Sequence, residues 1–318
     1  MIDWIPQLAL LLIQIALVLL LAPLVSGFIA KTKARLQLRR GPRLTQSYSD
    51  LLKLFRKEPV ISHHASWLFR GTPYIVFAST VTVALLVPTA YSVVPFHWAG
   101  DAITVIALFA LGRFFLALAG LDAGSAFGGL GSSREMSIAS IVEPAMMLGI
   151  FAVAVTAGST NLSVIVSTLS TTTASMLHPS HILAFAGLFI VTIAETGRIP
   201  VDNPATHLEL TMIHEAMVLE FSGRYLALIE WASQVKLLVF LAILTNVFFP
   251  IGIATDFTFL ALAQGIGAFC GKILLLALAI AVLESTNAKL RLFRVPDLLM
   301  VAFTFSLLSL ILYFLIGS

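Results

Sequence analysis

Apolar segments about as long as a lipid bilayer is thick recur along the whole chain, and they restrict its fold more than any other feature. About 20 predominantly apolar residues in a helix cross the hydrocarbon core of a bilayer. Runs of this kind occupy residues 8–29, 73–94, 103–121, 138–157, 182–194, 226–250, 257–283 and 298–316. The fifth run is short because charge enters at Glu195, and its helix is expected to continue toward Arg198.

The composition also indicates a membrane protein. Of the 318 residues, 59% are hydrophobic and 11% are charged, and the mean hydropathy is +1.00. A soluble domain carries about 25% charged residues. We therefore predict an all-α integral membrane protein with about eight transmembrane helices. Residues 1–318 are expected to form a single membrane domain, in which the first span is too long for a cleaved signal peptide.

Positive charge lies on one side of the predicted spans. All but three of the 19 Lys and Arg residues fall in the inner loops 30–72, 122–137, 195–225 and 284–297. The other three, Arg113, Lys236 and Lys272, lie within spans. Basic loops of multi-pass proteins stay cytoplasmic, so the chain is expected in the inner, cytoplasmic membrane of the cell. A nucleic-acid partner is not expected, because the positive charge is spread over short loops beside lipid.

Few residues suit a metal or a cluster. Cys270 is the single cysteine, so the chain alone is expected to bind neither an iron–sulfur cluster nor a nickel–iron centre. His207 and His214 are seven residues apart but lack a third convergent ligand, and no metal site is predicted. In the uncharged outer loop 158–181, we expect His178 and His181 to be solvated.

Ionisable residues at membrane depth are the strongest functional feature. A charge in the middle of a span costs about 2.5–3.5 kcal/mol on insertion scales, so such side chains usually face protein or water and act on ions. They are Arg113, Glu143, Glu195, Glu230, Lys236, Lys272 and Glu284. For Arg113, Lys272 and Glu284, pairing between helices as a purely structural contact is an equally good interpretation.

The inner loop 195–225 is the richest segment. Asn203 followed by Pro204 predicts a helix start, and Glu209, Glu215 and Glu220 then lie on different faces of the helix at about 100° per residue. These acids cannot form one compact site by themselves, but each can pass protons to partners from other helices. The alternative, a solvated acidic loop, predicts more Lys and Gly than this Met- and Leu-rich segment has.

An amphipathic helix is predicted in the inner loop 30–72. Leu44, Tyr48, Leu51, Leu52 and Phe55 recur at offsets of three and four residues. This pattern is typical of a helix that lies in the membrane interface. The same helix is equally suited to form the floor of a cavity against a docked subunit.

Several motifs resemble one known family. They are Ala34–Pro42, Gly120–Ser125, Ser133–Glu135, Glu143, Ala194–Asp202 and Glu220–Gly223. Together they are similar to the membrane subunit called H or 1 in respiratory complex I. They are also similar to its counterparts in energy-converting nickel–iron hydrogenases, such as hydrogenase-4 component C and formate hydrogenlyase subunit 4. The resemblance covers nearly the whole chain.

The resemblance implies a non-redox, eight-helix subunit that docks a peripheral electron-transfer arm. Its implied partners are a hydrogenase-like large subunit, a cluster-binding small subunit and antiporter-like membrane subunits, in addition to the lipid bilayer. The resemblance implies that iron–sulfur clusters lie in the partner subunits and leaves open whether the large subunit also holds nickel–iron. The implied docking and cavity residues are Arg35, Arg39, Arg40, Gly41, Pro42, Asp122, Arg134, Glu135 and Arg198. The expected proton path contains Glu143, Glu195, Asp202, Glu209, Glu215, Glu220, Glu230 and Lys236.

Departures from the complex I pattern favour the hydrogenase branch. Arg39 with Arg40, Asp122 and Ser133–Glu135 look like that branch, and the segment after Asp202 carries fewer carboxylates than complex I members do. The quinone-binding H-type subunit of a respiratory NADH dehydrogenase stays an alternative. A stand-alone ion transporter is another, although the broken helices in two matching halves that are common in transporters are not recognisable here.

Overall fold

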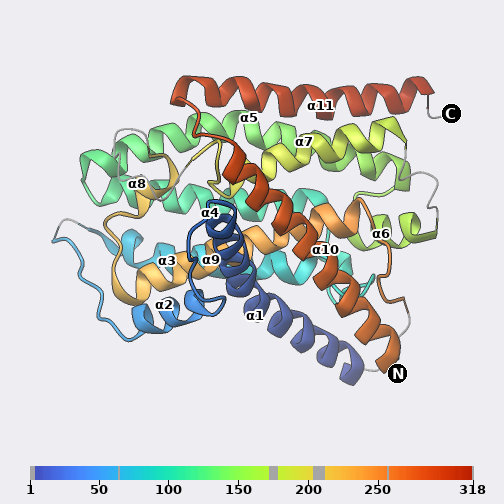
Figure 1. Cartoon of the computed structure of the whole chain (residues 1–318), viewed down its shortest axis with the longest axis horizontal. Coiled ribbons are helices and arrows are strands. Elements are labelled where there is room, and N and C mark those ends of the chain that lie inside the picture. The colour runs from blue at the N-terminus through green and yellow to red at the C-terminus, as the bar shows by residue number, and fades with distance from the viewer. Residues whose placement is uncertain (1–3, 64, 172–177, 203–211, 256–257, 317–318) are drawn as a thin grey trace.

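Helices make up the regular structure of the chain in the computed structural model, which describes residues 4–63, 65–171, 178–202, 212–255 and 258–316 (Figure 1). The helices are α1 (Trp4–Leu36), α2 (Gln46–Phe55), α3 (Trp67–Leu86), α4 (Ala102–Asp122), α5 (Ala126–Ala157), α6 (Leu162–Thr171), α7 (Pro179–Glu195), α8 (His214–Val218), α9 (Gly223–Ala242), α10 (Phe259–Thr286) and α11 (Val295–Ile316). A π-helical turn, Ile243–Val247, extends α9 directly.

The prediction of an all-α integral membrane protein is confirmed. Within the described residues, α1, α3, α4, α5, α9, α10 and α11 are each long and apolar enough to cross a membrane. The remaining predicted span, 182–194, corresponds to α7, which has 17 residues. At 1.5 Å per residue α7 is about 26 Å long, which is close to the thickness of the hydrocarbon core.

Two helices extend into segments that the sequence predicts as loops. The first, α5, begins at Ala126, so most of the predicted inner loop 122–137 is helical. The side chain of Ser125 caps this helix by accepting a hydrogen bond from the backbone N–H of Gly128 at 3.2 Å. The second, α6, lies within the predicted outer loop 158–181. Both segments pack against other helices, which hydropathy alone does not reveal.

The expectation that His181 is solvated is wrong. His181 is 4% exposed, and its Nε2 lies 2.8 Å from the backbone oxygen of Phe248. The cause is the start of α7 at Pro179, which brings His181 into the first turn of a packed helix. His178, at the N-cap position of α7, is exposed as expected.

The predicted amphipathic helix is α2. Leu51 is buried, and the hydroxyl of Tyr48 donates a hydrogen bond to the backbone oxygen of Leu20 in α1. The ring of Phe55 meets the ring of Trp231 in α9 edge to face, with centroids 6.1 Å apart. The apolar side of α2 therefore packs against α1 and α9.

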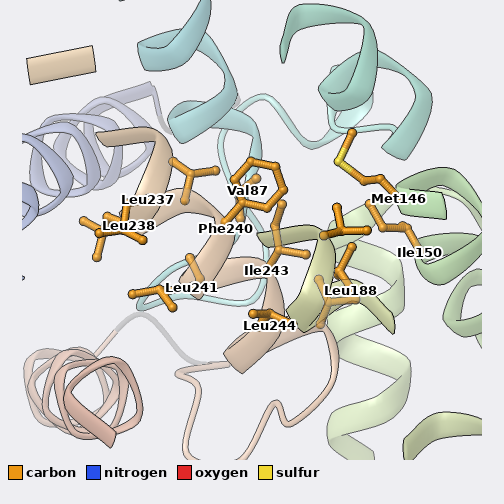
Figure 2. Packing of buried hydrophobic residues seen from close by; sticks show 14 of the residues in the cluster. Val87, Met146, Ile150, Leu188, Leu237, Leu238, Phe240, Leu241, Ile243 and Leu244 are labelled. Atoms are coloured by element: carbon orange, nitrogen blue, oxygen red, sulfur yellow. The ribbon is translucent and has the colours of Figure 1, made fainter. Parts of the chain in front are cut away.

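The core surrounds the second half of α9. Figure 2 shows Leu237, Leu238, Phe240, Leu241, Ile243 and Leu244 among side chains of α5, α7 and the segment after α3, and all six are 2% exposed or less. The ring of Phe240 stacks on that of Phe109 in α4, with centroids 4.8 Å apart. Because α9 is enclosed along this stretch, its Lys236, one residue earlier, must find its partners within the protein.

Small residues bring the outer helices close together. In Figure 1, α5, α7 and α11 lie side by side, and their contacts agree with that view. A Cβ at Gly187 of α7 would lie 3.0 Å from the backbone oxygen of Ala302 in α11. Between α4 and α5, a Cβ at Gly128 would lie 2.2 Å from the backbone oxygen of Gly120. Close backbone approach of this kind drives helix association in membranes.

We expect Gly128→Ala to lower the thermal stability of the chain, because its methyl group would collide with the backbone of α4. Overpacking of this kind costs about 1–3 kcal/mol. The measurement is the midpoint of thermal unfolding of the purified protein in detergent. Gly129→Ala is the matched control, since a Cβ there has no heavy atom within 4 Å. Equal midpoints for the two variants would contradict the close contact of α4 and α5.

Candidate functional site

Arg113 is the centre of a buried ion cluster. It projects from α4 with its side chain 3% exposed, and its Nη1 lies 2.5 Å from Oε1 of Glu143. Its Nε lies 3.5 Å from Oε1 of Glu135. Its Nη2 forms an ion pair with Glu195, the last residue of α7. One guanidinium thus holds carboxylates from α5 and α7.

Lys236 adds a second cation to this cluster. Its ammonium nitrogen lies 2.7 Å from Oε2 of Glu195 and 5.9 Å from the centroid of the Phe109 ring. Glu195 therefore joins the cations of α4 and α9. Three carboxylates face two cations: the side chain of Glu195 is 2% exposed and that of Glu143 is 37% exposed. Removing one partner of a buried pair such as Arg113 and Glu195 typically costs about 3–5 kcal/mol. The cluster fixes the positions of α4, α5, α7 and α9.

A small cavity lies beside Arg113. Its volume is about 40 Å³, and its polar lining includes Glu135, His214, Ser233 and Lys236. A water molecule needs about 10–15 Å³ of such volume and several polar partners. The cavity is therefore suited to a few water molecules and is too small for a cofactor.

A larger cavity lies toward the ends of the helices that adjoin the basic loops. Its volume is about 320 Å³. Its ionisable lining consists of Lys33, Arg198, Asp202, His214, Glu215, Glu230 and Glu284. These side chains come from α1, α8, α9, α10 and the segment after α7, so the cavity forms only when these elements assemble.

The two cavities share residues. His214 of α8 and Ser233 of α9 line both of them. Burial lowers the pKa of the His214 imidazole, which favours its neutral form. A neutral imidazole donates at one nitrogen and accepts at the other. We call the series of polar side chains from the Arg113 cluster, past His214, to the carboxylates of the larger cavity the polar route.

Glu215 is the acid of this route that is suited to titrate near neutral pH. Burial, with the nearby carboxylates of Glu230 and Asp202, raises the pKa of Glu215 to about 7. A carboxyl group with a pKa near the working pH exchanges protons readily in both directions. Glu215 lies on α8, immediately after His214.

Ion pairs hold the inner edge of the larger cavity. Glu284 of α10 accepts from Lys33 at 3.1 Å and from Arg198 at 2.8 Å. Asp202 lies 2.7 Å from the ammonium of Lys289 and accepts from the backbone N–H of His214 at 3.2 Å. Asp202 therefore fixes the start of α8, and with it the position of the imidazole between the cavities.

Of the eight predicted path residues, six meet in this region, one does not, and one cannot be placed. Glu143, Glu195, Asp202, Glu215, Glu230 and Lys236 lie in the ion cluster or line the cavities. Glu220 is exposed and lies outside the linings of both cavities. Glu209 lies outside the described residues.

The residues predicted for docking separate into two groups. Arg35, Arg39, Arg40 and Pro42 are exposed at the end of α1 and in the turn after it, and Gly41 packs back against α1. The others make internal contacts. Asp122 accepts from the backbone N–H and hydroxyl of Ser66 at 2.8 and 2.9 Å. Arg134 donates to the backbone oxygen of Met212 at 2.8 Å, and Arg198 pairs with Glu284.

Glu135 was predicted among the docking residues, but it joins the Arg113 cluster and the small cavity. A usable indication was present. Glu135 and Glu143 are eight positions apart, a little over two helical turns, so on one continuous helix they share a side. The predicted break between loop 122–137 and span 138–157 hid this relation. His214, by contrast, gave no local indication of its position between two cavities.

Comparison with known proteins identifies the family of the chain. The family model described as NADH dehydrogenase matches residues 8–314. The chain belongs to this family. It is 36% identical to formate hydrogenlyase subunit 4 of Escherichia coli strain K12 over 298 residues, which cover 94% of this chain and 96% of that protein. It is 33% identical to hydrogenase-4 component C of the same strain, over 93% of this chain and 92% of that protein.

More distant relatives agree with this assignment. The NADH-quinone oxidoreductase subunit named H in Rickettsia typhi is 29% identical, over 80% of this chain and 77% of its own length. A solved chain of the membrane-bound sulfane sulfur reductase, an archaeal respiratory membrane complex, has the same fold. Its TM-score is 0.78 at 20% identity, and the match covers 96% of this chain and all of that chain. The protein is a membrane subunit of the complex I-like type.

The raised pKa of Glu215 predicts a pH-dependent stability. Glu215 holds its proton to about pH 7 in the folded protein but only to about its ordinary value of 4.5 when unfolded. Its stabilising contribution is complete below the unfolded value and is lost as the pH rises through about 7. Glu215→Gln stays neutral, so its unfolding midpoint should exceed that of the wild type at about pH 8 and not at about pH 4. A shift of the pKa from 4.5 to about 7 corresponds to a difference of about 3 kcal/mol.

Thermal unfolding in detergent across this pH range is the measurement. Glu220→Gln is the control, because Glu220 is an exposed carboxylate of the same segment that lies outside both cavities. A pH-independent difference between Glu215→Gln and the wild type would mean that folding does not raise the pKa of Glu215.

Proposed function

We propose that this chain is the non-redox membrane subunit of a hydrogenase-type complex. In this role it docks a peripheral redox arm and couples electron transfer there to the movement of protons or sodium ions. The observation that carries the proposal is a pair of neighbouring cavities, each with ionisable side chains in its lining, that share His214 and Ser233. The two Escherichia coli relatives, whose names describe hydrogenase and formate hydrogenlyase subunits, support the hydrogenase branch.

The chemistry of the route suits ion transfer. In this proposal Glu215 exchanges protons with the larger cavity at neutral pH, and His214, which lines both cavities, passes them toward the smaller one. In the ion cluster, a proton that neutralises one carboxylate weakens its pairing with Arg113 or Lys236. The remaining carboxylates then hold the cations more tightly. Charge can therefore be redistributed between α5, α7 and α9 without a large movement of the helices.

A quinone is less well supported as a ligand of this route. Sites for such ligands are mostly apolar, with a few placed polar groups. The larger cavity is instead lined by seven ionisable side chains, and the smaller one measures about 40 Å³. Iron–sulfur and nickel–iron centres fit partner subunits, because the single Cys270 offers this chain no thiolate set.

We expect Glu195→Gln to lower ion movement per electron transferred to near zero, because Glu195 is the carboxylate that joins Arg113 and Lys236. The assay compares membrane potential and electron-transfer rate in sealed vesicles that contain the intact complex. Glu195→Asp, which keeps the charge, should retain part of the coupling. Asp50→Asn, an exposed acid on α2, should behave as the wild type. Pumping by Glu195→Gln at the wild-type ratio would contradict the proposed path.

The exposed turn after α1 is the proposed docking surface for the peripheral arm. Arg35, Arg39, Arg40 and Pro42 project there without an ion pair among the described residues. The proposed orientation places this turn on the cytoplasmic side, since most basic residues lie in the inner loops. Charged groups at such rims mainly guide association and choose the partner.

Reversing charge in this turn should release the peripheral subunits. The double variant Arg39→Glu with Arg40→Glu is expected to recover less of the partner subunits than the wild type during purification at low salt. The difference should narrow as the salt concentration rises, because salt screens attraction and repulsion alike. Arg291→Glu with Arg294→Glu is the control, because these exposed residues lie in a different inner loop. Equal recovery of the partners with both double variants would remove the turn from the docking surface.

A further inference from the structure

The motif Glu220–Gly223 packs the start of α9 against α3 and the segment between α2 and α3. The ring of Phe221 stacks on that of Phe69 in α3, with centroids 4.0 Å apart and planes 5° apart. The hydroxyl of Ser222 accepts from the backbone N–H of Val60 at 2.8 Å and donates to its oxygen at 3.1 Å. These contacts fix the segment against the membrane domain.

Gly223 makes the closest backbone contact of this motif. Its φ is +54°, where a side chain is strained. A Cβ there would lie 2.6 Å from the backbone oxygen of Glu58 and 2.7 Å from that of Lys57. Only glycine lets the backbone of this segment lie so close to the first turn of α9. The contacts of this motif therefore set the distance between the basic residues that lie on either side of it.

Four basic side chains converge on one cavity beside this motif. Its volume is about 540 Å³, and its basic lining consists of Arg56, Lys57, Arg70 and Arg224. They come from the segment after α2, the first turn of α3 and the first turn of α9. Glu58 is the single acidic residue of the lining. Within the described part of the chain, none of the four cations has a carboxylate within 4.0 Å. Such an excess of positive charge favours a bound anion.

Aromatic residues place this cavity at the depth of lipid headgroups. On α3, Trp67 and Tyr74 stand on either side of Arg70 in sequence and are 76% and 52% exposed. Trp and Tyr are enriched where a membrane meets water. The guanidinium of Arg224 lies 5.7 Å from the ring centroid of Tyr225, and that ring meets Tyr74 edge to face at 6.1 Å. Arg224 therefore sits directly beside a pair of aromatic rings.

We infer that this cavity binds the phosphate headgroup of an anionic phospholipid from the leaflet on the side of the basic loops. The guanidinium groups of Arg70 and Arg224 match phosphate oxygens in pairs, and Arg56 and Lys57 neutralise the remaining charge. The exposed rings of Trp67 and Tyr74 provide apolar surface for an acyl chain. An acidic protein segment would use the same charges but not this exposed aromatic surface.

Native mass spectrometry of the intact complex tests the site. The delipidated complex is titrated with phosphatidylglycerol, with phosphatidylcholine and with inorganic phosphate. Arg70→Gln with Arg224→Gln should bind phosphatidylglycerol about 30-fold more weakly, equivalent to about 2 kcal/mol for two basic residues near a membrane surface. Arg70→Lys with Arg224→Lys should keep most of the affinity. Arg291→Gln with Arg294→Gln, which removes two exposed charges elsewhere, should keep all of it.

Four outcomes would overturn the inference. They are unchanged affinity in the Arg70 and Arg224 double Gln variant, equally tight binding of phosphatidylcholine, equally tight binding of inorganic phosphate, and capture of a polypeptide by a photocrosslinker at position 57 in intact membranes. Crosslinking of that position to phospholipid would support it. Because the two arginines are exposed, the substitutions leave the packed core in place, and an unchanged unfolding midpoint verifies this.

Discussion

The ion cluster around Arg113 is the interaction on which the rest of the membrane domain depends. A charge placed in a span is costly unless it is paired, and here one guanidinium and one ammonium hold carboxylates from α5 and α7. The cluster therefore decides which faces of four helices meet. It also leaves polar space beside it, since ionised side chains cannot be covered entirely by apolar ones. The stability of this region and the ion transfer proposed for it depend on the same charged side chains.

The fold was predictable because its evidence is local. Each apolar run carries its own length, so seven long helices and the shorter α7 followed from hydropathy, and the amphipathic α2 followed from its periodicity. The extension of α5 was missed because polar residues at its start resemble a loop. Ser125, a good helix cap, marked the true beginning.

The site was predictable only in part. Its residue types and depth followed from the sequence, and most of the expected acids do meet. The ion pairs that these residues form did not follow from the sequence. Lys33 and Glu284 are 251 positions apart, and several cations were available as partners for Glu195. His214 became informative only when two cavities proved to share it. Pairings at long separation depend on how helices pack, and no periodic pattern records that.

The enclosed position of α9 has a consequence for biogenesis. Membrane proteins are synthesised from the N-terminus, so α4, α5 and α7 have left the ribosome before α9 does. When Lys236 reaches the translocon, Glu195 and the ring of Phe109 are already available to receive it. Because of the order of the helices in the chain, the buried cation of α9 therefore has partners within the protein as soon as it enters the membrane.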